Sequence, residues 1–337
     1  MISEGVVTAE EAVTSGVMVQ DVGRSHQMYS VSVGGVPRAY LKSFGPSRGA
    51  SDGSAAKERA VAALAAERPA VAALVPRHLP WRGPQAVVVT EAQPGRAAWA
   101  DEADGGEQGA LWSDLVRRIA KPLADFHRAT RDLAAPGARP PPALAAKPPW
   151  VLALASGDAA PEIWQTQHIT RATGRISADP WLCQGLRAAR GIWRDMCLIH
   201  ADLKHDNVLL LDRDGVSGVV IIDWEMARVG DPAWDIAALA VRLPMTALGE
   251  DPWSERTIER TAELLSAYTE VSRLPAPAVA KRLPAYMAAW LVMSAIQHQS
   301  TQAPDTSDDG ASELLDKAAL GFSRREQITR SLIRAVS

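Results

Sequence analysis

The sequence is poor in the residues that mark secreted, zinc-binding and membrane-spanning chains. Among its 337 residues there are only two cysteines, Cys183 and Cys197. Two thiols cannot build a disulfide framework, and neither lies in a C-x-x-C pair, so neither a disulfide-rich domain nor a zinc site is expected. The chain has no uncharged apolar run of about 18 residues, so no membrane-spanning helix is predicted. We therefore expect a reduced, cytoplasmic protein.

The chain also lacks an excess of charge of either sign. Its formal net charge is −3 and its pI is about 6.2. Such a balance gives no general attraction to nucleic acid or to an anionic membrane, so we expect neither as a partner. The N-terminus has no basic start followed by an apolar run, which argues against a signal peptide. With 47% hydrophobic residues, the chain is expected to be globular and large enough for two lobes.

The first ninety residues have the pattern of a small antiparallel sheet with one helix. Runs rich in β-branched or aromatic residues alternate with glycine, and Gly34-Gly35 between two such runs is a hairpin signal. The expected strands and the expected helix occupy residues 17–22, 27–33, 37–44 and 86–90, and residues 55–66, respectively.

A break at residues 93–95 (QPG) separates this part from a mostly helical remainder, so the lobe boundary is placed there. We expect a small lobe over residues 1–92 and a large lobe over residues 93–337. The layout predicts an α+β, bilobal, protein-kinase-like fold. Within the large lobe, the expected features are helices at 111–130 and 182–193, an irregular Pro/Ala linker at 133–149, short strands at 198–199, 208–211 and 219–222, and helices after 234 with breaks at Pro244, Pro252, 275–277 and 303–310.

The strongest chemical signal is the run HADLKHDN at residues 200–207, which lies between two apolar strands. The pattern H-x-D-x-x-x-x-N is the catalytic loop of protein kinases and their relatives. Phosphoryl transfer needs an acceptor hydroxyl held in line and a carboxylate that receives its proton, a role that Asp202 fits. Asn207 can turn its amide oxygen toward a metal, and His200 is expected to brace the loop. A zinc cluster of these residues is not favoured by the spacing.

Two further motifs follow the loop at fixed distances. Asp223 ends the apolar strand VVII, sixteen residues after Asn207, where a kinase carries its metal-binding carboxylate; a hard oxygen ligand suits Mg²⁺. The run GDPAWDIA at residues 230–237 reads as a helix start, with Asp231 as the N-cap and Pro232 at the first helical position.

Together, HADLKHDN, IIDWE and GDPAWDIA resemble the signatures of the aminoglycoside and choline phosphotransferases. The resemblance is close in the second half of the chain and limited to layout in the first half. It implies an ATP- and Mg²⁺-dependent kinase acting on a hydroxyl acceptor. It further implies that Asp235 holds the catalytic loop through backbone contacts.

The resemblance also assigns the nucleotide-binding residues of the small lobe. Lys42 on the third strand would hold the α- and β-phosphates of ATP. Its ion-pair partner would come from the following helix, with Glu58 as the first choice and Glu67 as the second.

The remaining nucleotide contacts are implied in the same way. The short loop after the first strand would touch the phosphates through Gly23 and Ser25. Backbone groups of the connector around Glu91 and Ala92 would bond to adenine. The motifs do not separate ATP from GTP.

The acceptor is left open between a small molecule and a peptide. An aminoglycoside pocket needs carboxylates, whereas this chain ends in the basic run SRREQITRSLIRAVS. Lys204, two residues after the expected base, resembles the Ser/Thr protein kinases, where a lysine helps to hold the γ-phosphate and the acceptor. A peptide kinase of lanthipeptide biosynthesis, working with a separate partner lyase, is therefore the alternative.

Two questions remain open from the sequence: which tryptophans line an acceptor pocket, and whether the protein is catalytically active. Of the 11 tryptophans, those considered as walls of an acceptor pocket are Trp99, Trp112, Trp150, Trp164, Trp253 and Trp290. A pseudokinase that only binds a partner is a third reading, disfavoured because Lys42, Asp202, Asn207 and Asp223 are all retained.

Overall fold

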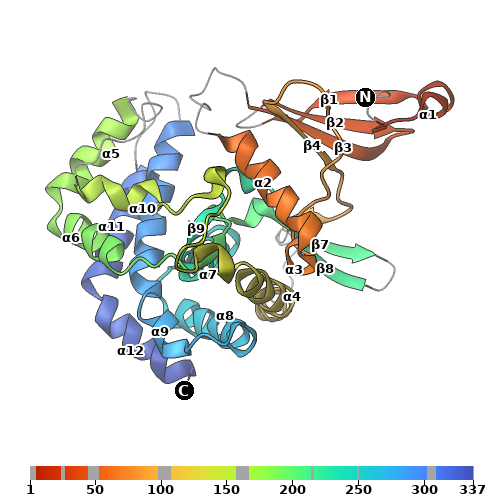
Figure 1. Cartoon of the computed structure of the whole chain (residues 1–337). Coiled ribbons are helices and arrows are strands. Elements are labelled where there is room, and N and C mark those ends of the chain that lie inside the picture. Colours follow the sequence, from red (N-terminus) through yellow and green to blue (C-terminus); the bar gives the residue numbers. More distant parts are fainter. Residues whose placement is uncertain are drawn as a thin grey trace.

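The computed structural model describes residues 5–23, 27–44, 53–97, 108–156, 167–213, 216–248, 250–301 and 309–336. The chain has two unequal lobes (Figure 1): a twisted sheet near the N-terminus, and a larger body of helices that holds the C-terminus. The predicted bilobal α+β architecture is therefore confirmed. No helix within the described residues is both long and apolar enough to cross a membrane.

The sheet of the small lobe is antiparallel, with its four strands in the order β1-β2-β3-β4. Gly34 and Gly35 form the β2–β3 turn with positive φ angles of 58° and 81°, which glycine adopts without steric cost. The register places Lys42 of β3 opposite Met28 on one side and Val88 on the other. The strands are β1 (Val17–Asp21), β2 (Gln27–Val33), β3 (Val36–Ser43) and β4 (Val87–Glu91).

Two helices lead from the sheet toward the large lobe: α2 (Ser54–Glu67) and α3 (Pro69–Ala72). After β4 the chain joins a second sheet, because β5 (Arg96–Ala97) pairs with β7 (Val208–Arg213), and β7 pairs with β8 (Val216–Ile221). A small two-stranded ladder of β6 (Cys197–Ile199) and β9 (Arg228–Gly230) completes the described strands. The predicted catalytic loop therefore lies between β6 and β7.

The helices of the large lobe surround α10, whose residues 283–294 are all buried. Its interior position explains why this helix is apolar on all sides. The helices are α4 (Gln108–Ala129), α5 (Gln167–Ala178), α6 (Pro180–Gly191), α7 (Pro232–Leu248), α8 (Glu255–Ser272), α9 (Ala276–Ala280), α10 (Leu283–Thr301), α11 (Asp309–Ser323) and α12 (Arg325–Val336). A short helix, α1 (Ala9–Thr14), precedes the first sheet.

Most of the predicted segments agree with the observed ones to within a few residues, and the Pro/Ala linker contains only short 3-10 turns. The predicted break at Pro244 is wrong, because α7 continues through it to Leu248. A proline removes one helical hydrogen bond. The burial of residues 232–241 against neighbouring helices stabilises α7 well enough for this loss to be tolerated.

Candidate active site

Two backbone hydrogen bonds hold the loop between β6 and β7 from below. The carboxylate of Asp235, on the first turn of α7, accepts from the N–H of His200 (2.8 Å) and from the N–H of Ala201 (2.9 Å). Ala201 has a left-handed backbone with φ of 66°. Such a conformation costs a non-glycine residue about 1–2 kcal/mol. The two bonds to a buried charge oppose that cost and fix the backbone next to Asp202.

Asp235 is itself positioned by side chains from two further helices. Nε2 of His127, on α4, lies 3.3 Å from its Oδ2, and Nδ1 of the same ring lies 2.9 Å from the hydroxyl of Tyr268 on α8. Asp235 and Tyr268 are completely buried, and His127 is 1% exposed. The loop is thus tied to three helices through one carboxylate.

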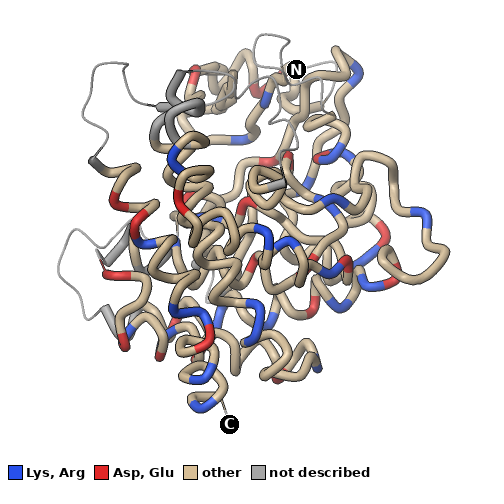
Figure 2. The backbone as a smooth tube through the Cα atoms, turned by 90° about the vertical axis from the view of Figure 1, so that its left-hand side faces the viewer, with Lys and Arg blue, Asp and Glu red and all other residues tan. Residues whose placement is uncertain are grey.

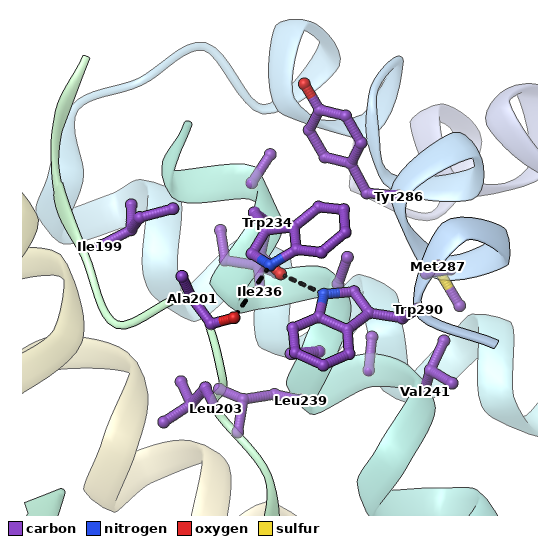
Figure 3. Close-up of a cluster of buried hydrophobic side chains, with 14 of the residues drawn as sticks. Ile199, Ala201, Leu203, Trp234, Ile236, Leu239, Val241, Tyr286, Met287 and Trp290 are labelled. Atoms are coloured by element: carbon purple, nitrogen blue, oxygen red, sulfur yellow. Dashed lines mark hydrogen bonds between the residues drawn. The ribbon is translucent and has the colours of Figure 1, made fainter. Parts of the chain in front are cut away.

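Aromatic residues form the floor under this loop (Figure 3). The indole N–H of Trp234 points to the carbonyl of Ala201 at 3.4 Å, and the indole N–H of Trp290 donates to the carbonyl of Trp234 at 3.1 Å. The rings of Trp234 and Tyr286 pack edge-on with centroids 5.6 Å apart. This apolar base packs the predicted catalytic loop against the core formed by α7 and α10.

His200 joins the loop to the segment that carries Asp223. Its Nδ1 accepts the N–H of Asp202 at 3.2 Å, and its Nε2 lies 3.0 Å from the carbonyl of Ile222. These partners require the proton on Nε2, which donates to that carbonyl. The ring also packs edge-on against Trp224, with centroids 4.7 Å apart. Asp202 and Asp223 are thereby held at a fixed separation.

The carboxylate of Asp202 is buried, and its two oxygens differ. Oδ2 lies 3.2 Å from Nζ of Lys204, whereas the buried Oδ1 has no hydrogen-bond partner among the described residues. Asn207 donates from Nδ2 to the carbonyl of Asp202 at 2.9 Å, which leaves its amide oxygen for another ligand. A buried oxygen without a partner is costly unless a ligand satisfies it, and it can accept a proton from a hydroxyl group.

Across the cleft, Lys42 lies among three carboxylates. Its Nζ is 3.2 Å from Oε1 of Glu58 and 2.6 Å from Oε2 of Glu225, and it contacts Oδ1 of Asp223. Of the two carboxylates weighed on α2, the partner is thus Glu58, which is buried, while Glu67 is exposed. Asp223 has a left-handed backbone with φ of 69°, as expected at a strained functional position.

The cluster perturbs the protonation of its members. Burial alone would lower the pKa of Lys42, but the charges of Glu58, Asp223 and Glu225 outweigh burial and raise it, so the ammonium stays charged. Burial raises the pKa of Glu58 to about 7; Lys42 opposes this rise, and the two neighbouring carboxylates add to it. The ammonium faces more carboxylates than it can neutralise, and the repulsion among them favours a bound cation.

The carboxylates also satisfy a geometric condition for a metal site. One oxygen each of Glu58, Asp223 and Glu225 lies within 4.8 Å of the others. Oxygen donors of this kind suit Mg²⁺ or Ca²⁺. The site opens into a cleft of about 410 Å³ between the lobes, which is lined by both small-lobe and catalytic-loop residues, including Lys42, His78, Thr90, Lys204, Asn207 and Asp223.

The described residues predicted to contact the base and the phosphates of the nucleotide through their backbone have hydrogen-bond partners within the small lobe. The N–H of Glu91 donates to the carbonyl of Arg77, and that of Ala92 donates to the carbonyl of Arg38, both at 2.9 Å. Both N–H groups therefore already have backbone partners and are not available to adenine. The N–H of Gly23 donates to the side chain of Asp21 at 2.9 Å, and Ser25 lies outside the described residues.

A family model described as "Phosphotransferase enzyme family" matches residues 20–279. The chain belongs to this family. The resemblance drawn from the three motifs is confirmed, and the chain is a kinase by its family. No curated protein matches the sequence significantly.

Solved structures agree on the fold of this phosphotransferase at low identity. Plasmodium vivax ethanolamine kinase superposes with a TM-score of 0.62 and 13% identity, covering 96% of this chain and 86% of that chain. An amicoumacin kinase in complex with AMP-PNP, Ca²⁺ and Ami gives 0.57 and 16%, covering 93% and 88%. A thermostable mutant of aminoglycoside phosphotransferase APH(4)-Ia, in a complex with ADP and hygromycin B, gives 0.52 and 18%, covering 98% and 99%. At these identities the likeness establishes the fold alone.

The sequence analysis did not identify one carboxylate of the cluster around Lys42, and it did not decide which tryptophans line a pocket. Glu225 was not singled out, although the spacing D-x-E puts its side chain beside Asp223 in the short turn after β8. Of the tryptophans considered as pocket walls, Trp112 and Trp290 are buried in the core, and Trp253 donates its indole N–H to the carbonyl of Lys317. Trp99 and Trp164 lie outside the described residues.

Proposed function

We propose that this phosphotransferase is an ATP- and Mg²⁺-dependent kinase that moves the γ-phosphoryl group to the hydroxyl of a small-molecule acceptor. The observation that carries the proposal is the unpartnered, buried Oδ1 of Asp202 on a backbone held by Asp235. Such a carboxylate can accept the proton of the acceptor hydroxyl. Phosphoryl transfer to a hydroxyl group requires a general base of this kind.

The cleft supplies the groups that ATP requires. Lys42 would bind the α- and β-phosphates, since its ammonium stays charged and lies in the cleft wall. Glu58 would orient that ammonium. The adenine would lie near Glu91 and Ala92 and use carbonyl oxygens of this connector in place of their occupied N–H groups. ADP and AMP-PNP in two structures of the same fold support a nucleotide here.

Asn207 and Asp223 would hold Mg²⁺, with Glu225 as a further carboxylate. Their oxygen donors fit this ion, and the cluster already gathers three carboxylates around one cation. A bound Mg²⁺ neutralises charge on the phosphates during transfer. His200 would keep the metal-binding segment and Asp202 at the required separation through its bonds to both.

The proposed boundary between the lobes stays at residues 92–93. It is supported by the last strand of the first sheet, which ends at Glu91, and by Arg96–Ala97, which pair with β7 of the large lobe. The short connector between them would form one wall of the nucleotide site and the hinge about which the lobes approach each other.

A small hydroxyl compound is the favoured acceptor, because the structures with this fold carry names or ligands of that kind: an ethanolamine kinase and a phosphotransferase with hygromycin B. One observation favours a Ser/Thr peptide as the second candidate. Nζ of Lys204 lies 3.2 Å from the carboxylate of Asp202, where it can contact both the γ-phosphate and an acceptor, as in protein kinases. In that case a separate lyase would be the partner.

A mass-spectrometric screen with ATP and Mg²⁺ tests the proposal. The acceptors are amino alcohols, aminoglycosides, sugar alcohols and Ser/Thr peptides, and Asp202→Ala is the control. A product one phosphoryl group heavier, absent with the variant, is expected. Failure of the wild-type chain both to form product and to bind ATP would instead favour a scaffold without catalysis.

A further inference from the structure

A second cavity lies in the large lobe, well away from the nucleotide cleft. It has a volume of about 650 Å³, is open to solvent, and is lined by the C-terminal end of α6, the junction of α9 and α10, and α12. Of these helices, α9 and α12 lie near the C-terminus (Figure 1). None of the residues around this cavity, which we call the α12 cavity, also lines the nucleotide cleft.

The rim of the α12 cavity is positively charged. Lys281, Arg325 and Arg330 line it, against a single carboxylate, Glu326. All four side chains are exposed, and none forms an ion pair with another residue of the described ranges. Basic positions also lie near the C-terminus in Figure 2. The lining of the cavity therefore carries an excess of two positive charges.

The floor of the α12 cavity is apolar. Ile192, Ala285 and Ile333 line it, and Thr329 is its one uncharged polar side chain. A floor of this kind favours a hydrocarbon body, because burial of apolar surface is favourable. The volume falls within the range of about 300–1,000 Å³ that is usual for small-molecule sites.

We propose that the α12 cavity binds a small amphiphilic anion: one carboxylate or phosphate head group joined to a short apolar body. Two guanidinium groups can bind the oxygens of such a head group with paired hydrogen bonds, and Lys281 adds a third cation. The body lies on the floor formed by α6, α10 and α12. A free inorganic anion would leave this floor exposed, and an amine would be repelled by the rim.

The cavity is connected to the catalytic machinery by covalent neighbours. Lys281 precedes Arg282, whose Nε lies 2.9 Å from Asp231, and Ala285 precedes Tyr286, whose hydroxyl donates to the same carboxylate at 3.0 Å. Asp231 lies directly before α7, which carries Asp235. The proposed site therefore lies near the N-terminal end of α7, the helix that carries Asp235. An anion bound there would not compete with the nucleotide for its cleft.

Isothermal titration calorimetry on the full chain tests this proposal with octyl phosphate and octanoate as probes. Both are expected to bind, whereas octanol, octylamine and inorganic phosphate are expected to bind at least tenfold more weakly. The double substitution Arg325→Glu and Arg330→Glu is expected to lower the affinity for octyl phosphate at least tenfold, and Thr329→Trp, which fills the cavity, is expected to abolish binding. Arg334→Glu is the matched control on the same helix, since Arg334 is exposed but does not line the cavity.

Several results would overturn the proposal. Equal binding of octylamine would show that the rim charge is not used, and equal binding of inorganic phosphate would reduce the site to a simple anion site. Undiminished binding by the double variant, with its thermal unfolding unchanged, would place the ligand elsewhere. Anionic vesicles that bind while octyl phosphate does not would assign the patch to a membrane surface. Displacement by an ATP analogue would show that the ligand occupies the nucleotide cleft.

Discussion

The ammonium group of Lys42 contacts the carboxylate of Asp223, which lies 181 residues further along the chain. Glu58 and Glu225 share the same ammonium. These three partners are the carboxylates whose oxygens lie within 4.8 Å of one another and could hold a cation. If Lys42 binds phosphate and Asp223 binds Mg²⁺, the phosphates and the ion occupy adjacent positions, so metal and nucleotide are expected to bind together.

Asp223→Asn should therefore weaken binding of ATP in the presence of Mg²⁺ at least tenfold, because the variant loses a charged ligand of the metal. Glu225→Gln should have a smaller effect in the same direction. Calorimetric titration with and without Mg²⁺ separates the metal-dependent part of the affinity. A Mg²⁺-dependent affinity that survives in Asp223→Asn would remove this residue from the metal site.

The two glutamates of α2 provide a matched pair. Glu58→Gln should lower kcat/KM for ATP about tenfold or more, since a charge-assisted hydrogen bond to the buried Lys42 contributes about 1.5–3 kcal/mol. Glu67→Gln, on the exposed part of the same helix, should leave kcat/KM unchanged. Steady-state kinetics at saturating acceptor measures both, and equal effects of the two substitutions would contradict the assignment of Glu58.

Asp235→Asn should lower kcat far more than it raises KM, and it should also destabilise the fold. An asparagine cannot accept with both terminal atoms, so one of the N–H groups of His200 and Ala201 loses its partner, at a cost of about 1–3 kcal/mol. Urea unfolding measures the loss of stability. Tyr268→Phe, which removes only the hydroxyl beyond His127, is the milder control. An Asp235→Asn variant with normal kcat would mean that the loop does not depend on this carboxylate.

His78, in the wall of the nucleotide cleft, should make stability depend on pH. Burial, with a smaller contribution from Arg59, lowers its pKa from the ordinary 6.5 to about 4. Between these values the unfolded chain binds a proton that the folded chain does not, so stability is lost as the pH falls from about 6.5 to about 4. At about 1.4 kcal/mol per pKa unit, the loss is limited to about 3 kcal/mol. Thermal unfolding of His78→Gln should lack this slope; an unchanged slope would assign the pH dependence to other groups.

Much of the fold follows from local patterns in the sequence. The strands of the small lobe and the helix around Glu58 were predicted within two residues at each end, because β-branched alternation and turn glycines are strong local signals. The structure brings the predicted catalytic loop and Asp223 together, as the spacing of the motifs indicated, because His200 bonds to both segments. The break predicted at Pro244 is absent because the burial of α7, a tertiary effect, offsets the cost of the proline.

What the sequence did not reveal depends on three-dimensional contacts. The support of Asp235 by His127 and Tyr268 joins three helices that are far apart in the chain, and no short motif encodes it. The N–H of Glu91 is occupied because residues 77–79 run beside β4 without forming a named strand, and the N–H of Ala92 is occupied because it bonds to Arg38 of β3. The α12 cavity likewise requires the ends of separate helices to be placed next to one another.

The central claim is that Asp202 is the base and not a part of the nucleotide site. The most direct test measures kcat and the dissociation constant for ATP side by side in the wild-type chain and in Asp202→Asn, once the screen has identified an acceptor. The account predicts that kcat falls by about 10²–10⁴, the usual contribution of a positioned base, while ATP affinity and thermal stability stay close to those of the wild type. A variant that retains wild-type kcat, or that loses turnover only because ATP no longer binds, would contradict the role assigned to Asp202.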